Sequence, residues 1–181
     1  MNNIRQIITS KIDDVKLFSL NTYSDSRGFF RETFNKEIES FLGKNNQFLQ
    51  DNESFSKYGV LRGLHFQKPP FEQSKLVRVS YGEIQDVIVD MRSESSTFGF
   101  WESFNLSSNN NLVLYVPKGF AHGFLVLSKE AVVNYKVDNY YNGEFDSGVF
   151  YKDKVLNINW ELPDDEIIIS DKDKALPKFI K

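Results

Sequence analysis

Hydrophobic and polar residues alternate over much of the chain, in short segments that turn-forming residues separate. This two-residue period, or a short unbroken apolar run, is typical of β-strands. The segments that show it are residues 18–22, 60–66, 74–81, 84–91, 113–116, 123–127 and 132–137. Groups of Gly, Pro, Asn and Ser lie between them, at the spacing of a sandwich or barrel. We therefore expect an all-β, antiparallel jelly-roll sandwich.

One segment has the period of a helix. Asn35 is suited to cap its N-terminus, and Gly43 is suited to end it. Between these two residues, Ile38, Phe41 and Leu42 fall on one helical face. The pattern predicts a short helix here, in a fold with one or two short helices in all.

The connections between the strands carry their own signals. The sequence from Tyr81 to Ile84 predicts a tight hairpin between the strands that flank it, and residues 106–112, rich in Ser and Asn, predict an exposed turn. From residue 164 on, a short apolar run among charged residues predicts a tail that wraps back over the barrel. There is no internal repeat, low-complexity segment or linker, so we expect one domain over residues 1–181.

Composition narrows the class of protein. The chain has 181 residues, 40% of them hydrophobic and 15% aromatic, which suits one β-rich globular core. A formal net charge of −3 gives no sign of a nucleic-acid or membrane partner. The absence of cysteine excludes disulfides and thiolate chemistry. No signal peptide and no apolar run of about 18 residues is present, so we expect a cytoplasmic protein.

Three predicted strands carry an ionisable group on the face that should be buried. Lys75, His122 and Tyr135 each share the parity of apolar neighbours in their own strands. Each has an ordinary explanation taken alone: a lysine at a strand end, a satisfied core histidine, or a core tyrosine whose hydroxyl reaches the surface. Together they are costly inside a sealed core, because buried polar groups need partners. Their coincidence indicates that the interior of the barrel is a ligand site.

The sequence favours a metal-free site. The chain has only two histidines, and the stretch His65-Phe66-Gln67 lacks the His-x-His pair usual in metal-binding jelly rolls. A facial triad of His65, His122 and one carboxylate is the alternative.

A series of motifs resembles the dTDP-4-dehydrorhamnose 3,5-epimerase family, in order along the chain. They are residues 59–67 (GVLRGLHFQ), 69–70 (PP), 73–79 (QSKLVRV), 86–92 (DVIVDMR), 96–99 (STFG), 117–124 (PKGFAHGF) and 139–141 (NYY). The likeness extends from about residue 18 to residue 177. It implies a cupin jelly roll, usually a homodimer, that needs no metal or organic cofactor. It also implies inversion of C3 and C5 in a nucleotide-diphosphate-linked 4-keto-6-deoxy sugar.

The resemblance assigns roles to individual residues. His65 resembles the general base, Tyr135 the general acid, and Lys75 the group that faces the C4 oxygen of the sugar. The family's Ser-x-Lys-Asp element appears at residues 170–173, so Asp173 is expected to orient His65, with Asp171 as the alternative. Several further positions resemble substrate-binding residues of the family. Arg27, Arg62 and His122 resemble residues that serve the diphosphate and sugar. Glu32, Gln50 and Asn52 resemble residues near the base and the substrate, and Tyr141 is expected to stack nearby.

Other functions stay open at this point. Asn142-Gly143 departs from the family pattern near the nucleotide, so the sequence leaves open dTDP or GDP and a hexose or heptose. A 3,4-ketoisomerase on the same scaffold, an epimerase that inverts only one carbon, and a non-catalytic sugar-binding module are the competing hypotheses.

Overall fold

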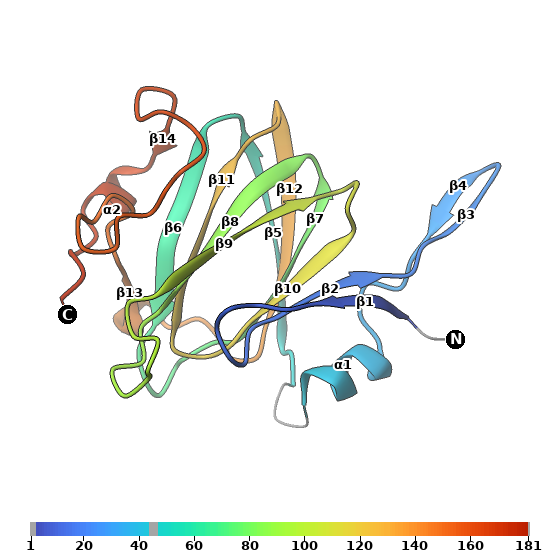
Figure 1. The fold of residues 1–181 in the computed structure, drawn as a ribbon, viewed down its shortest axis with the longest axis horizontal. Coiled ribbons are helices and arrows are strands. Elements are labelled where there is room, and N and C mark those ends of the chain that lie inside the picture. Colours follow the sequence, from blue (N-terminus) through green and yellow to red (C-terminus); the bar gives the residue numbers. More distant parts are fainter. Residues whose placement is uncertain (1–2, 44–46, 181) are drawn as a thin grey trace.

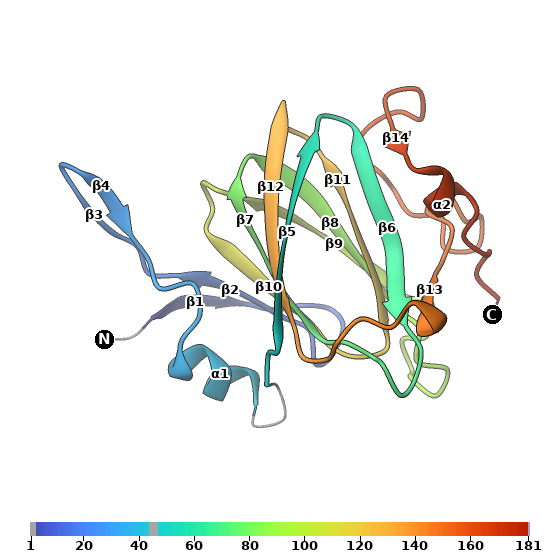
Figure 2. The ribbon, with the colours of Figure 1, turned by 180° about the vertical axis from the view of Figure 1, so that it is seen from behind.

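Two β-sheets face each other across the hydrophobic core (Figures 1 and 2). The structure, a computed structural model, describes residues 3–43 and 47–180. In chain order the elements are β1 (Ile4–Ile8), β2 (Lys16–Leu20), β3 (Tyr23–Asp25), β4 (Gly28–Phe30), α1 (Lys36–Leu42), β5 (Gln50–Lys57), β6 (Val60–Gln67), β7 (Lys75–Tyr81), β8 (Glu83–Asp90), β9 (Trp101–Ser107), β10 (Leu112–Val116), β11 (Phe120–Val126), β12 (Glu130–Val137), a 3-10 turn (Gly143–Phe145), β13 (Asp146–Gly148), β14 (Ile168–Ile169) and α2 (Asp171–Lys174).

The strand order interleaves distant parts of the chain, as in a jelly roll. One sheet runs β1-β2-β10-β7-β12-β5 and the other β13-β6-β11-β8-β9. The pairs within both orders are antiparallel, and the short β14 adds to β6 in parallel. This confirms the predicted all-β jelly roll and its seven predicted strands. The helix is also confirmed: the Asn35 side chain accepts hydrogen bonds from the amides of Glu37 and Ile38, and Gly43 follows the last turn.

The predicted hairpin at Gly82 is wrong. β7 ends at Tyr81 and β8 begins at Glu83, but β7 pairs with β10 and β12 whereas β8 pairs with β11 and β9. One intervening residue is too few for the usual two-residue hairpin loop. The turn instead carries the chain from one sheet to the other. Gly82 has a φ of +81°, a conformation that glycine adopts without strain. A side chain would also not fit there, because a Cβ would lie 2.1 Å from the carbonyl oxygen of Glu130.

Three apolar clusters hold the layers together. The largest lies between the sheets and includes Val77, Val133 and Phe124. The outer face of the first sheet is covered by α1, whose Ile38 and Leu42 are buried. The outer face of the second sheet is covered by the segment after β13, which contributes Val149, Leu156 and Phe179. The predicted wrapping of the C-terminal tail over the barrel is thus confirmed, and α2 is held beside β6 (Figure 1).

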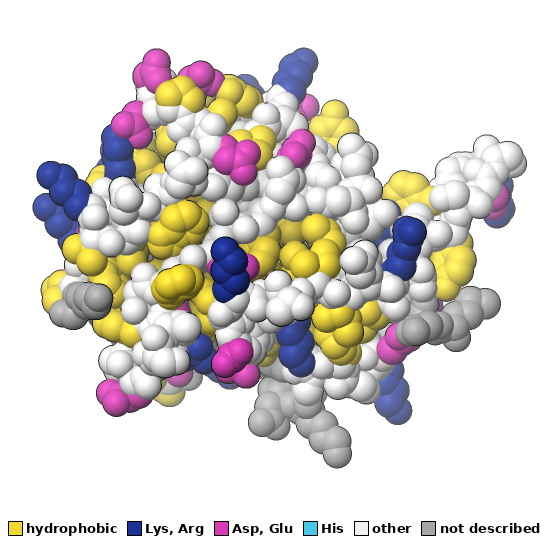
Figure 3. Space-filling view, viewed as in Figure 1, with side chains coloured by type: hydrophobic (Ala, Val, Ile, Leu, Met, Phe, Trp, Pro, Cys, Tyr) yellow, Lys and Arg dark blue, Asp and Glu magenta, His cyan; other side chains and the backbone are white. Residues whose placement is uncertain are grey.

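One element stands clear of this body. The β3–β4 hairpin, called the arm below, projects away from both sheets (Figures 1 and 2). Its aromatic side chains are exposed to solvent: Tyr23 is 43% exposed, Phe29 67% and Phe30 64% (Figure 3). Among the described residues, no helix is long and apolar enough to cross a membrane.

Candidate active site

A bulge in β6 turns two candidate residues toward the interior. His65 lies opposite His122 on β11, and Arg62 lies opposite Phe124, so three steps along β6 match two along β11. Side chains directly opposite each other in a sheet share a face, and Phe124 belongs to the core between the sheets. Arg62 and His65 therefore both point inward, although their sequence parity differs. The intervening Leu64 packs in the outer cluster.

Glycines make this bulge possible. Gly63 has a φ of +133°, and a Cβ on it would lie 2.5 Å from the Cα of Gly123 on β11. A Cβ on Gly123 would in turn lie 2.6 Å from the carbonyl oxygen of Arg62. Only two residues without side chains allow the strands to approach so closely. The Arg-Gly-Leu-His sequence thus positions the site through its backbone as well as its side chains.

Asp173 binds His65 from α2, which lies beside β6. The short helix α2 is capped by Ser170, whose hydroxyl accepts the Asp173 amide at 3.1 Å. One oxygen of the buried Asp173 carboxylate lies 2.7 Å from His65 Nε2, and the other accepts the Gly63 amide at 3.2 Å. Asp171 instead is exposed and pairs with Lys174 at 3.1 Å. The structure therefore brings Asp173, and not Asp171, to His65.

The contact with Asp173 defines the state of the His65 ring. A carboxylate accepts hydrogen bonds only, so Nε2 carries the proton and Nδ1 keeps a lone pair. Burial lowers the pKa of His65, and the hydrogen bond and charge of Asp173 oppose that shift. The ring is therefore neutral near pH 7 and able to accept a proton at Nδ1.

Lys75 supplies a cation at the same place. It begins β7, is 9% exposed, and donates from Nζ to the carbonyl oxygen of His65 at 3.3 Å. Burial lowers the pKa of Lys75 to about 8, against the charges of Asp86 and Asp146. The amine is thus still mostly protonated at neutral pH.

Tyr135 points into the interior from the opposite sheet. On β12 it lies between Val77 of β7 and Asn52 of β5, and it packs against the core between the sheets. Burial raises the pKa of Tyr135 while the Arg62 charge opposes this, so the phenol keeps its proton. The His65 side chain remains 33% exposed although it points inward. The interior is therefore open to solvent at this end.

The inner face of β5 is polar. Asn52 lies opposite Tyr135 and accepts a hydrogen bond from Gln50 at 2.8 Å. Arg62 donates from Nε to the hydroxyl of Ser56 at 3.0 Å. The predicted residues Gln50, Asn52 and Arg62 thus come together beside Tyr135. β5, and with it Ser56, was not predicted as a strand from the sequence, because β5 lacks apolar alternation.

His122 has a carboxylate partner of its own. Its Nε2 lies 3.0 and 2.9 Å from the two oxygens of Asp86 on β8, and both side chains are buried. Sequence reasoning did not single out Asp86. The available signal was a charged residue that shares the strand parity of Ile84 and Ile88, two apolar residues of the same strand.

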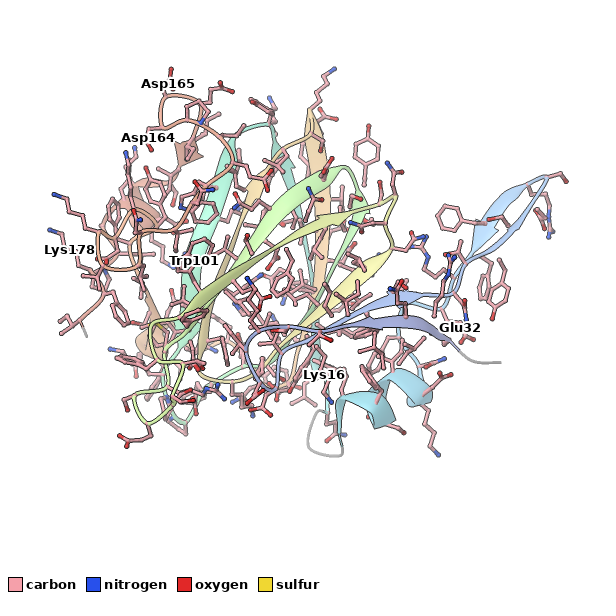
Figure 4. All side chains as sticks on the ribbon, in the orientation of Figure 1. Lys16, Glu32, Trp101, Asp164, Asp165 and Lys178 are labelled. Atoms are coloured by element: carbon pink, nitrogen blue, oxygen red, sulfur yellow. The ribbon has the colours of Figure 1, made fainter. Side chains whose placement is uncertain are left out.

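Three other predicted residues are exposed on the surface of this chain. Arg27, at the tip of the arm, has a side chain that is 87% exposed and pairs with Asp25. Glu32 follows the arm and accepts a hydrogen bond from Asn35 at 2.6 Å, on the side of the molecule opposite the C-terminal segment (Figure 4). Tyr141 is exposed in the loop after β12. This chain alone does not bring Arg27 or Glu32 to His65.

A further ion pair borders the site. Lys172 of α2 donates to Asp146 of β13 at 2.6 Å, which raises the pKa of Lys172, with smaller contributions from Tyr141 and Asp173. Tyr141 therefore lies on the same side of the molecule as Asp173. This pair was not predicted from the sequence.

His65 and His122 do not share a carboxylate, since Asp173 holds one and Asp86 the other. Among residues 3–43 and 47–180, no three His, Asp or Glu side chains are grouped so that they could hold a metal ion.

Comparisons with known proteins identify the family of the chain. The family model for dTDP-4-dehydrorhamnose 3,5-epimerase matches residues 9–181. The enzyme of that name from Shigella flexneri is 46% identical over 175 residues, which cover 96% of this chain and 96% of that protein. The crystal structure of the Bacillus anthracis enzyme with TDP and PPi bound has a TM-score of 0.91 at 47% identity, over 96% of this chain and 99% of that one.

A third comparison includes a sugar ligand. The Legionella pneumophila dTDP-6-deoxy-D-glucose-3,5-epimerase was solved in complex with dTDP-4-keto-L-rhamnose, and it has a TM-score of 0.89 at 42% identity. The match covers 97% of this chain and 99% of that one. The chain therefore belongs to the dTDP-4-dehydrorhamnose 3,5-epimerase family, whose members are isomerases of the cupin jelly-roll fold.

Proposed function

We propose that this protein inverts C3 and C5 of a dTDP-linked 4-keto-6-deoxy sugar by removing and returning protons beside the ketone. The observation that carries the proposal is that His65 of β6, bound by Asp173 of α2, and Tyr135 of β12 point into the interior from opposite sheets. The names of the relatives support thymidine diphosphate and a 4-keto hexose over GDP or a heptose. Action by one domain over residues 1–181, in the cytoplasm, completes the proposal.

The base follows from the chemistry of the substrate. A ketone at C4 acidifies the hydrogens on C3 and C5, because their removal leaves an enolate. The neutral His65 takes the proton at Nδ1, the nitrogen that Asp173 leaves free. Asp173 then stabilises the imidazolium that forms. The lowered pKa of His65 ensures that the base is unprotonated at the start.

The acid and the oxyanion group complete the reaction. Tyr135 stays protonated at neutral pH and returns a proton from the face of the sugar opposite His65, which inverts the carbon. The charge of the enolate gathers on the C4 oxygen. The buried ammonium of Lys75 lies beside the backbone of His65 and stabilises that oxygen more strongly than it could in water.

Substrate binding is assigned to polar side chains of the interior and to Tyr141. Arg62 suits the diphosphate, because its planar fork matches paired phosphate oxygens. Gln50, Asn52 and His122 line the same interior and are assigned to the sugar. Tyr141, exposed in its loop, is assigned to stacking on the base of the nucleotide.

The exposed arm supports the proposal of a second copy of the chain. Phe29 and Phe30 are exposed on a hairpin that packs on neither sheet, and Arg27 lies at its tip. We propose a homodimer in which the arm of one copy reaches the site of the other, which gives Arg27 and Glu32 access to substrate. Two inactive variants, His65→Asn and Arg27→Ala, should then complement each other when mixed, up to about a quarter of wild-type activity in randomly reassorted dimers. A mixture that stays inactive although heterodimers form would show that Arg27 does not act in the site of the other copy.

The experiment that tests the function uses the wild-type protein. It is incubated in D₂O with dTDP-, GDP- and heptose-linked 4-keto substrates, and each product is analysed by mass spectrometry and NMR. Deuterium at both C3 and C5 of the dTDP-linked hexose, with inversion at both, is the expected result. A moved carbonyl would instead identify a 3,4-ketoisomerase, inversion at one carbon a single-site epimerase, and binding without exchange a non-catalytic module.

A further inference from the structure

A second imidazole–carboxylate pair lies beside the catalytic dyad. His122 and His65 occupy opposite positions on β11 and β6, so their side chains leave the same sheet face about 5 Å apart. Asp86 binds His122 Nε2 with both carboxylate oxygens, at 3.0 and 2.9 Å. The mechanism above gives Asp86 no role.

The position of Asp86 is costly for stability. It lies in the middle of β8 with no exposed surface, next to the fully buried Val87. It is opposite Phe124 on β11, so it points to the inner face of the sheet. A buried carboxylate costs free energy that a hydrogen bond only partly offsets, and an apolar residue here would pack at lower cost. A carboxylate at this position therefore favours a functional role in the interior over a role in packing.

The Asp86 carboxylate interacts with two ionisable side chains, His122 and Lys75. It holds His122 directly, and among the charges acting on Lys75 it is the strongest that favours the ammonium form. Lys75 is also faced by Asp146 from β13 and by His65, with its partner Asp173, from β6. Asp86 is thus a buried anion that acts on Lys75, the residue assigned to the C4 oxygen.

We propose that Asp86 is a positioning residue of this epimerase site, which fixes His122 in one orientation beside Lys75 and supplies the negative charge that keeps Lys75 cationic. The inference rests on the proposed function, because it assigns Lys75 and His122 to the sugar. Since a carboxylate only accepts, His122 carries its proton on Nε2 and leaves Nδ1 for substrate. Asp86 acts through these two residues and does not touch the reacting carbons.

The first test compares two buried aspartates of the same strand. Asp86→Asn removes the charge with little change in shape, whereas Asp90→Asn alters a carboxylate that serves Arg92 and Thr97. Asp86→Asn should lower kcat about 100-fold with little change in KM. It should also move the alkaline limb of the kcat profile to lower pH by about one unit, because Lys75 loses an opposing charge. Asp90→Asn should lower Tm and leave the limb in place.

The second test reads the imidazoles directly. The chain has only two histidines, so long-range ¹H–¹⁵N spectra of the wild type and His65→Asn assign both. The wild type should show His122 with its proton on Nε2, and Asp86→Asn should change the His122 signals alone. A wild-type His122 protonated on Nδ1, or an Asp86→Asn variant whose alkaline limb does not move, overturns the inference. Deuterium wash-in by the wild type is measured alongside: its absence would refute the proposed function itself, not merely the role of Asp86.

Discussion

Replacing Asp173 by Asn isolates the contribution of one charge to catalysis. The Asp173 carboxylate is 4% exposed, lies 2.7 Å from His65 Nε2, and has its other oxygen on the Gly63 amide. Asn has the same shape, so it can still accept from the Gly63 amide. Two things change: the imidazolium loses its counter-charge, and the amide can present an N–H that favours the wrong tautomer of His65.

The size of the effect follows from the geometry. Opposite charges about 4 Å apart, at an effective dielectric constant of about 20, attract by about 4 kcal/mol. Loss of that attraction in the transition state lowers kcat by about 1,000-fold. The pH profile of kcat/KM should also change. Asp173 raises the pKa of His65 against burial, so its removal lowers that pKa further and shifts the acid limb of kcat/KM to lower pH.

The assay is steady-state epimerisation across pH, with circular dichroism and Tm to confirm folding. A folded Asp173→Asn variant that keeps more than about a tenth of wild-type kcat, or whose acid limb moves to higher pH, would refute this account of the dyad.

Other predictions follow from single contacts. Tyr135→Phe should still release protons to solvent from C3 and C5 but stall inversion; normal turnover, measured by product NMR, would place the acid elsewhere. Gly63→Ala should lower Tm and kcat together, because its Cβ would lie 2.5 Å from the Cα of Gly123, whereas Gly43→Ala has a similar φ but meets no atom within 4 Å and should affect only Tm. Dialysis against EDTA should leave activity unchanged; loss that Fe²⁺ or Zn²⁺ restores would establish a metal requirement.

The sequence predicted strands well where one face is apolar. β7, β11 and β12 alternate clearly, and the inward polar residues on them, Lys75, His122 and Tyr135, were identified from parity alone. β5 was missed because its inner face carries Gln50, Asn52 and two serines, which give no apolar period. A strand that lines a wet cavity looks like a loop in a single sequence.

Backbone features explain the remaining differences. The sequence around Gly82 is typical of a hairpin turn. Only the pairing of β7 and β8 with different strands shows that the chain changes sheets there. The bulge at Gly63 reverses the parity of β6, so alternation could not show that Arg62 and His65 share a face. Contacts between distant segments, such as Asp86 with His122, depend on register, which one sequence does not contain.

The central claim is that a single histidine removes the protons from both carbons. Its most direct test is deuterium uptake from D₂O by the His65→Asn variant, measured at C3 and C5 of the dTDP-linked 4-keto sugar by NMR. We expect uptake to stop at both positions while the variant stays folded and binds dTDP. Continued uptake at either carbon would show that another base serves it.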